Sequence, residues 1–318
     1  MVVKRRKNHH VFEALITKCQ ALDAVPTAVV HPLSDVALLG AVEAAEAGLI
    51  APVLVGPSAR IQRLAEAHDF DLSSFEMVDT EDDLEAAAKG VALCRTGRCE
   101  ALMKGSLHTD HFMHAAMADQ TGLRTRRRIS HVFVLDVPTY PRTLLITDAA
   151  VNIYPTLEDK VDIVQNAIDL AHVLGIAEPK VALLSAVETV TPRITSTIDA
   201  AALCKMADRE QITGGLIDGP LAYDNAVDRR AAKIKHIRSR VAGRADVLVV
   251  PDLESGNMLA KQLEYLAEAA AAGVVVGARV PIVLTSRSDN AKTRLASAAV
   301  AVLLAHARRR TLREAVPA

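Results

Sequence analysis

Residues 281–294, PIVLTSRSDNAKTR, contain the pattern that decides the fold. The segment Ile282–Thr285 is apolar and mostly β-branched, which is typical of a buried strand. From Asn290 onward an alanine- and leucine-rich pattern predicts a helix to about Arg308. The strand therefore leads directly into the helix, as in a βα unit, and the free N–H groups of the helix start face whatever lies beyond the strand.

The residues between that strand and that helix carry groups that bind anions. Ser286 supplies a hydroxyl, Arg287 a guanidinium fork and Asp289 a carboxylate that can accept a proton. A capped helix with a surface arginine would have the same sequence, so this segment alone leaves both interpretations open.

Length and composition limit the class of protein. The chain has 318 residues, half of them apolar, which is enough for two domains or one two-lobed unit. A net charge of −1 gives no reason to expect a nucleic acid or an anionic membrane as partner. The four cysteines have no CxxC or zinc-like spacing, and no apolar run has the length of a signal peptide or a membrane span. We expect a cytoplasmic protein with no metal site.

Strand-like runs alternate with helical patterns through the first 105 residues, which predicts a parallel sheet with helices on both faces. The expected strands of this part are Ala28–Val30, Pro52–Val55 and Ala101–Met103.

The third of these strands ends in Lys104, Gly105 and Ser106, just before another predicted helix. Because ligands of parallel sheets lie beyond the carboxyl ends of the strands, this segment and residues 286–289 are expected to share one crevice. An ordinary exposed lysine is the alternative interpretation of Lys104.

An arginine run follows at Arg124 and 126–128, at the entrance of the apolar strand that begins near His131. Such runs are usually solvated unless anions or carboxylates compensate their charge. A second basic segment, residues 229–244, has no aromatic residues interleaved, so we interpret it as a solvated surface, part of which can meet a phosphorylated ligand.

The pattern changes near residue 138, where a turn separates the apolar runs Val132–Val137 and Thr143–Thr147 and predicts an antiparallel hairpin. Further βα units follow, including a helix from residue 253 to about 272. In this half, strands end repeatedly in polar residues next to helix starts, and together these predict the floor of a cleft, although each alone is more typical of a cap or turn. The residues are Asp148, Asn152, Asp218, Asp252 and Asn257.

Several segments in fixed order resemble the phosphate acetyl/butyryltransferase family. They are MKGSLHT (103–109), GLRTRRRISHV (122–132), TDAAVNIYPT (147–156), DGPLAYDNA (218–226), ADVLVVPDLESGN (245–257) and PIVLTSRSDNAK (281–292). The resemblance runs from about Pro26 to the C-terminus. The N-terminal part also resembles the transferase half of members fused to an enoyl-CoA hydratase domain, for which this chain has no room.

The resemblance implies an α/β fold of the isopropylmalate-dehydrogenase type: a two-lobed parallel-sheet α/β sandwich with a cleft between the lobes. We expect residues 1–134 and 282–318 to form the first lobe and residues 135–281 to form an inserted second lobe. A homodimer is also implied.

The implied reaction is acyl-CoA plus phosphate giving acyl phosphate plus CoA, with coenzyme A as substrate and no permanently bound cofactor. In related acetyltransferases the serine and arginine matching Ser286 and Arg287 bind CoA and stabilise the transition state. The aspartate that serves as base lies further along the chain there than Asp289, so the assignment of Asp289 stays open. Asp289 belongs to the pattern TSR-x-D, which leans toward butyryl over acetyl.

The family keeps an arginine shortly before the serine matching Ser130, so either Arg127 or Arg128 is expected to bind phosphate. The resemblance and the strand-end pattern together give the expected substrate-binding residues: Lys104, Ser106, Arg127, Arg128, Ser130, Asn152, Asp218, Asp252 and Asn257.

Two other functions are alternatives. A hydroxy-acid dehydrogenase that uses NAD and a metal on the same superfold would draw its ligands from Asp218 and Asp252, but the chain has neither a DxxxD cluster nor a G-x-G-x-x-G loop. A catalytically silent homologue, or a docking module for a separate hydratase, is disfavoured by the intact Ser286, Arg287 and Lys104.

Direct transfer in a ternary complex is the expected mechanism. None of the four cysteines lies at a strand end of the expected cleft, and no histidine is close to Ser286 in the sequence. An acyl-enzyme on Ser286 is the alternative.

Overall fold

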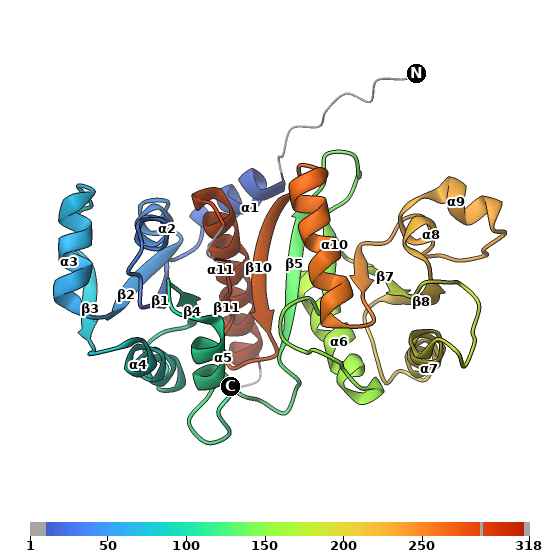
Figure 1. Ribbon diagram of the computed structural model, residues 1–318, viewed down its shortest axis with the longest axis horizontal. Helices are drawn as coiled ribbons and strands as arrows, with labels where there is room; N and C mark the ends of the chain where they lie inside the picture. Colours follow the sequence, from blue (N-terminus) through green and yellow to red (C-terminus); the bar gives the residue numbers. More distant parts are fainter. Residues whose placement is uncertain (1–10, 287–288, 315–318) are drawn as a thin grey trace. The chain divides into compact units, whose positions relative to one another are not determined.

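The computed structural model describes residues 11–286 and 289–314 (Figure 1). The chain divides into two compact units. The terminal unit contains residues 10–127 and 272–318, and the inserted unit contains residues 128–271. The resemblance places the lobe boundaries at 134/135 and 281/282, a few residues after the bounds of these compact units. The division into two lobes at those positions stays a prediction.

The terminal unit is a sheet with helices on both sides. Its strand order is β3-β2-β1-β4-β11-β10, and Figure 1 shows α2 and α11 on one side of these strands with α4 and α5 on the other. The strands are β1 (Val25–Val30), β2 (Ile50–Gly56), β3 (Glu76–Asp79), β4 (Ala101–Lys104), β10 (Ala270–Val276) and β11 (Ile282–Val283). The helices are α1 (Val11–Gln20), α2 (Asp35–Glu46), α3 (Ser58–Ala67), α4 (Asp83–Arg95), α5 (Thr109–Met117) and α11 (Ala291–Glu314).

Burial of both faces explains why most strands of this unit are apolar runs, with the partly exposed edge strand β3 as the exception. In β1, for example, only Pro26 is not fully buried. β1 pairs in parallel with β2 and β4, and β11 pairs in parallel with β4, which confirms the predicted α/β class with parallel strands. Ser34 and Asp82 cap α2 and α4 by accepting a hydrogen bond from a backbone N–H of the first turn.

The inserted unit has the strand order β5-β6-β9-β7-β8. Figure 1 shows α6 and α7 on one side of these strands and α8 and α10 on the other. The strands are β5 (Ser130–Asp136), β6 (Leu144–Thr147), β7 (Lys180–Leu184), β8 (Leu216–Leu221) and β9 (Val247–Val249). The helices are α6 (Leu157–Val173), α7 (Thr195–Asp208), α8 (Tyr223–Val227), α9 (Arg229–Ile234) and α10 (Leu253–Leu266).

The predicted hairpin is confirmed, because β5 and β6 pair antiparallel with Val132 opposite Thr147. β6 then pairs in parallel with β9, and β9 in parallel with β7. The carboxyl ends of β6, β7 and β9 therefore lie at one edge of this sheet, where Asp148 and Asp252 follow their strands.

One predicted element is wrong. The helix expected to reach residue 272 ends at Leu266, and the alanine- and valine-rich residues after it form strand β10. Glu268 has a φ of 54°, in the left-handed region that helices do not continue through. β10 is buried on both faces, a setting that favours valine in a strand.

The part of the chain that the structure describes contains no helix long and apolar enough to cross a membrane.

Candidate active site

The turn after β11 is organised by Asp289. The backbone N–H of Ser286 donates to Asp289 Oδ2 at 2.7 Å, and the N–H of Asp289 donates to the Ser286 carbonyl at 3.2 Å. Asp289 is buried while Ser286 is exposed. The carboxylate therefore closes a turn that carries Ser286 to the surface. Arg287, the third predicted catalytic residue, lies outside the described residues.

Arg294 supports the same turn from the first part of α11. Its Nη1 donates to Thr285 Oγ1 at 2.8 Å and its Nη2 to the Ser286 carbonyl at 3.0 Å. Burial lowers the pKa of Arg294, and the nearby Asp289 carboxylate opposes that shift. Gly40 of α2 makes room for it, since a Cβ there would lie 2.9 Å from Arg294 Cδ. Arg294 thus fixes the backbone on which Ser286 stands.

The Lys104–Ser106 loop leaves the sheet beside this turn. β4 and β11 are parallel neighbours with Met103 opposite Val283, so their carboxyl ends are adjacent. Lys104 is buried, with Nζ 3.4 Å from the Gly105 carbonyl. The two segments therefore begin at one edge of the sheet, and the crevice that they are expected to share stays a prediction.

Ser106 joins the loop after β4 to the loop after β1. Its hydroxyl donates to the His31 carbonyl at 2.9 Å and accepts from the Leu33 N–H at 3.1 Å. Gly105 permits the contact, because a Cβ there would lie 2.4 Å from the Val30 carbonyl oxygen. In this structure the Ser106 hydroxyl positions the loop.

A chain of hydrogen bonds in the inserted unit ends on Arg128. Asp148 accepts the N–H groups of Ala150, Val151 and Asn152 at 2.9 to 3.1 Å, and the Asn152 Nδ2 donates to it at 2.5 Å. Asn152 Oδ1 in turn accepts from Arg128 Nε at 2.7 Å. Burial raises the pKa of Asp148, and these hydrogen bonds oppose the rise.

Two more acids hold the Arg128 segment. Asp159 Oδ1 lies 3.2 Å from Arg128 Nη1, and Asp162 Oδ2 accepts the Arg128 backbone N–H at 2.7 Å. The side chain of Arg128 is 44% exposed, so the guanidinium is fixed from one side and open to solvent on another. A guanidinium fixed in this way keeps donors for a bidentate contact with an oxyanion.

Ser130 is fully buried and belongs to the same network. Asn166 Nδ2, on α6, donates to the Ser130 hydroxyl at 2.9 Å and to the Arg128 carbonyl at 2.8 Å. Arg127 is half-buried, and its backbone N–H donates to Thr125 Oγ1 at 3.1 Å.

The start of α10 closes on the Asp148–Asn152 loop. Asn257 Nδ2 donates to the Ala149 carbonyl at 3.1 Å, and Gly256 approaches so closely that a Cβ would lie 3.0 Å from the Asp148 carbonyl oxygen. Asp252 is the N-cap of α10 and accepts the Ser255 N–H at 2.8 Å.

The predicted residues of the inserted unit therefore fall into two groups. The first group lies around the 148–152 loop and contains Arg128, Ser130, Asn152 and Asn257, together with Asp252, the N-cap of the helix that carries Asn257. Asp218 lies within β8 and accepts the N–H of its own neighbour Gly219 at 2.9 Å. Among the described residues, it makes no hydrogen bond or ion pair with that loop. Among those residues, no three His, Cys, Asp or Glu side chains gather as metal ligands would.

Comparison with known proteins decides the family. The phosphate acetyl/butaryl transferase family matches residues 84–302 of the chain. The chain belongs to this family. The predicted family and its enzyme class are thereby confirmed: the protein is a phosphate acyltransferase, whose substrates are acyl-CoA and inorganic phosphate, and the dehydrogenase alternative is not favoured.

Relatives of the acyltransferase cover nearly its whole length. The phosphate acetyltransferase of Rhizobium meliloti is 62% identical over 298 residues, 94% of this chain and 94% of that protein. The phosphate butyryltransferase of Clostridium acetobutylicum is 39% identical over 294 residues, 92% of this chain and 98% of that protein. Among solved structures, a branched-chain phosphotransacylase from Enterococcus faecalis V583 superimposes with a TM-score of 0.77 at 29% identity, covering 88% of this chain and 99% of that one.

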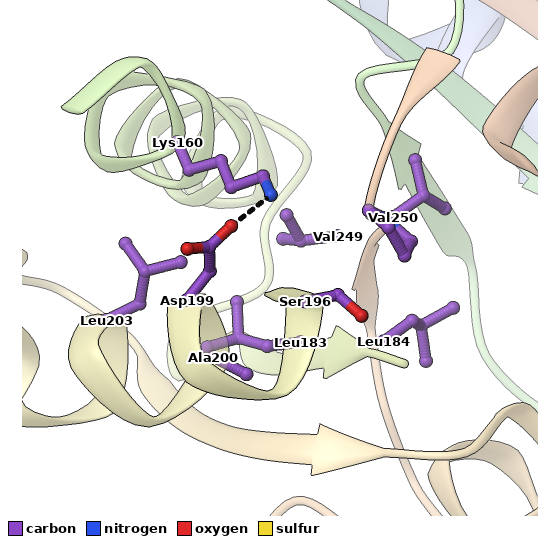
Figure 2. A pocket seen from close by; sticks show the side chains of 10 residues that line it. Lys160, Leu183, Leu184, Ser196, Asp199, Ala200, Leu203, Val249 and Val250 are labelled. Carbon is purple, nitrogen blue, oxygen red and sulfur yellow. Dashed lines mark hydrogen bonds and ion pairs between the residues drawn. The ribbon is translucent and has the colours of Figure 1, made fainter. Parts of the chain in front are cut away.

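Sequence reasoning missed three residues that shape the acyltransferase: Arg294, Asn166 and Lys160. Lys160 lies on the apolar stripe of α6 with Ile163 and Val164, and is buried. A lysine on such a stripe signals a buried partner, and Figure 2 shows it pointing at Asp199 of α7, with Nζ 2.7 Å from Oδ2.

The ion pair of Lys160 and Asp199 lines a small cavity together with Ser196, Val249 and Val250 (Figure 2). Its volume of about 10 Å³ holds about one water molecule. This cavity is too small for a substrate, so the ion pair has a structural role between α6 and α7.

Replacement of Lys160 by methionine is expected to lower the free energy of unfolding by about 3 kcal/mol, because it leaves a mostly buried carboxylate without its partner. Urea denaturation of the acyltransferase measures this loss. The double variant Lys160→Met/Asp199→Leu removes both charges and should recover most of it. A double variant as unstable as the single one would show that the loss comes from packing and not from the unpaired charge.

Proposed function

We propose that the acyltransferase moves an acetyl group: acetyl-CoA plus inorganic phosphate gives acetyl phosphate plus CoA, and the reverse. The observation that carries the choice is the 62% identity to the Rhizobium meliloti phosphate acetyltransferase, against 39% to the Clostridium acetobutylicum phosphate butyryltransferase. The TSR-x-D pattern around Asp289 favours butyryl transfer. The identity over nearly the whole chain is the stronger argument, because the pattern depends on a single position.

A panel of straight-chain acyl-CoA esters from two to six carbons, each with saturating phosphate, tests the acyl preference. We expect kcat/KM to be highest for acetyl-CoA and to fall by about tenfold or more for butyryl-CoA, a change within the range of 1–3 kcal/mol per methylene that pocket discrimination supplies. A higher kcat/KM for butyryl-CoA would reject the acetyl assignment and leave the family assignment intact.

The phosphate site is assigned to Arg128. Its guanidinium is held by Asn152 Oδ1 and Asp159 Oδ1, and Asn152 is itself fixed by Asp148. A cation with few accessible rotamers loses little entropy on binding, and the planar fork matches two oxygens of phosphate. In this assignment Asn152 and Asp148 are positioning residues, and the buried Ser130 and Asn166 support the backbone of the arginine.

The CoA ester is assigned to the turn after β11. Ser286 and Arg287 take the roles implied by the resemblance: they bind CoA and stabilise the oxyanion that develops as the acyl carbonyl is attacked. The structure of the turn supports a shaping role for Asp289, because its Oδ2 accepts the Ser286 N–H. Lys104 and Ser106 leave the sheet at the adjacent strand end, where Lys104 adds positive charge for an anionic substrate.

Transfer is proposed to be direct, without an acyl-enzyme. Burial raises the pKa of the thiols of Cys19 and Cys99 to about 11 and that of Cys204 to about 12, so these cysteines stay protonated at neutral pH and are poor nucleophiles. Burial also lowers the pKa of His131 to about 3, which makes it too weak a base to activate a serine hydroxyl.

The homodimer and the cytoplasmic location expected from the sequence stay predictions. The exposed apolar side chains Met258, Tyr265 and Leu266 on α10 offer one surface for a second copy.

A further inference from the structure

The basic segment 229–244 separates into paired and unpaired cations. Lys235 lies 3.3 Å from a Glu188 oxygen and 3.1 Å from an Asp224 oxygen, and Arg240 lies 3.0 Å from Glu178. In the part of the chain that the structure describes, no carboxylate lies within ion-pair distance of Arg229 or Arg244. These two arginines line a common cavity.

The cavity has a volume of about 540 Å³ and lies wholly within the inserted unit. Three arginines face it, together with a mainly apolar wall of one tyrosine, one proline and one valine. The full lining is Tyr140, Pro141, Arg142, Val227, Asp228, Arg229, Gly243 and Arg244.

Partly buried hydrogen bonds fix one wall of this cavity. Arg142 Nη1 lies 2.9 Å from Asp246 Oδ1, and Asp246 is buried and accepts the Lys180 N–H with its other oxygen. The Tyr140 hydroxyl donates to the Ala245 carbonyl at 2.6 Å. Both side chains are therefore held in place before any ligand arrives.

The part of the wall formed by Arg229 and Gly243 depends on the glycine. Its φ is 76°, and a Cβ there would lie 2.5 Å from Arg229 Cα. The Gly243 N–H donates to the Asn225 carbonyl at 2.7 Å, which ties the loop to α8. Gly243 precedes Arg244, and its backbone lies against that of Arg229. Only glycine, which has no Cβ, allows the two backbones to approach this closely.

The charges that face the cavity sum to an excess of positive charge. Asp246 compensates Arg142, and the Asp228 carboxylate accepts the N–H groups of Arg230 and Ala231 as the cap of α9. The Asp228 carboxylate keeps its charge, so Arg229 and Arg244 together leave one positive charge in excess. Both are guanidinium forks of the kind that bind phosphate oxygens bidentately.

The cavity is separate from the phosphate site assigned above. Arg142 and Arg244 precede β6 and β9, whereas Asp148 and Asp252 follow the carboxyl ends of the same strands. β6 has four residues and rises about 3.3 Å per residue. The arginines at the start of the strands and the aspartates at their carboxyl ends are therefore separated by the length of the strand, on the order of 13 Å.

We propose that this cavity is a second binding site, for a phosphorylated organic anion of nucleotide size. Arg229 and Arg244 would bind its phosphates, with the fixed Arg142 beside them, and Tyr140, Pro141 and Val227 would contact its organic part. Ligand pockets of about 300–1,000 Å³ accommodate molecules of this class, whereas a lone phosphate would leave most of the cavity unfilled.

Calorimetric titration of the full-length protein with ADP, without CoA, tests the proposal. CoA is omitted because it is itself a phosphorylated anion with a nucleotide part and would compete for the cavity. ADP should bind at least once per chain. The double variant Arg229→Ala/Arg244→Ala should weaken its Kd at least tenfold. A matched control, Arg230→Ala/Lys233→Ala, removes two exposed cations of the same segment outside the cavity and should keep the wild-type Kd.

Hydrogen exchange of the unmodified protein gives a second readout that needs no variant. ADP should protect the backbone amides of residues 139–140, 142–143 and 243–246. Absence of this protection would overturn the proposal, and so would equal weakening in the control variant. Pyrophosphate binding as tightly as ADP would contradict the assignment of the organic part to Tyr140, Pro141 and Val227.

Discussion

Replacement of Arg287 by alanine is expected to lower kcat about 100- to 1,000-fold, because removal of one fixed donor to a developing oxyanion typically costs about 3–4 kcal/mol of barrier. The KM values for acetyl-CoA and phosphate should change far less than kcat if the arginine acts mainly in the transition state. Arg287→Lys should recover little, since a point charge does not replace the fork.

The matched control for this variant is Arg310→Ala, which removes an exposed arginine of α11 in the same unit. Thermal unfolding of all three variants should follow that of the unmodified protein. A kcat for Arg287→Ala within about threefold of the unmodified enzyme would remove Arg287 from the catalytic residues, since that is less than 1 kcal/mol of barrier.

Replacement of Arg128 by alanine is expected to raise the KM for phosphate about 10- to 100-fold, the effect of losing charge-assisted hydrogen bonds worth about 1.5–3 kcal/mol. The KM for acetyl-CoA should stay nearly constant. Asn152→Ala leaves the charge but removes the Oδ1 that holds Arg128 Nε, so it should raise the same KM by a smaller factor. Initial rates at varied phosphate measure both effects.

Arg126→Ala is the control for Arg128, because Arg126 is an exposed arginine of the same run. Arg127→Ala tests the other candidate that the sequence leaves open. A phosphate-specific effect in Arg127→Ala alone would transfer the site to that residue. No effect on phosphate dependence in either variant would mean that the run is a solvated charge cluster.

Much of the fold could be predicted because most of its inner strands are buried on both faces. β1, β2 and β9 are apolar runs that local periodicity identifies, and the prolines near residue 140 separate the two strands of the hairpin. Strand β10 was not predicted from the sequence because its first half is alanine, a residue that favours helices. Its burial between neighbouring elements makes it a strand.

The sequence predicts which polar residues follow the strands of the candidate site, but not which of them contact one another. The polar residues after β4, β6 and β11 mark one edge of each sheet, and that edge follows from topology alone. The contact between Arg128 and Asn152 joins positions 24 residues apart, and Arg294 is a charge on an otherwise buried helix face. Such partners depend on tertiary packing, which no local pattern contains.

Direct transfer is tested by the exchange of radiolabelled phosphate into unlabelled acetyl phosphate, followed with and without CoA. Direct transfer in a ternary complex predicts exchange when CoA is present and none when it is absent, because without CoA no acyl acceptor completes the cycle. Exchange without CoA would contradict direct transfer and indicate an acyl-enzyme. No exchange even with CoA would contradict the assignment of phosphate acetyl transfer to this protein.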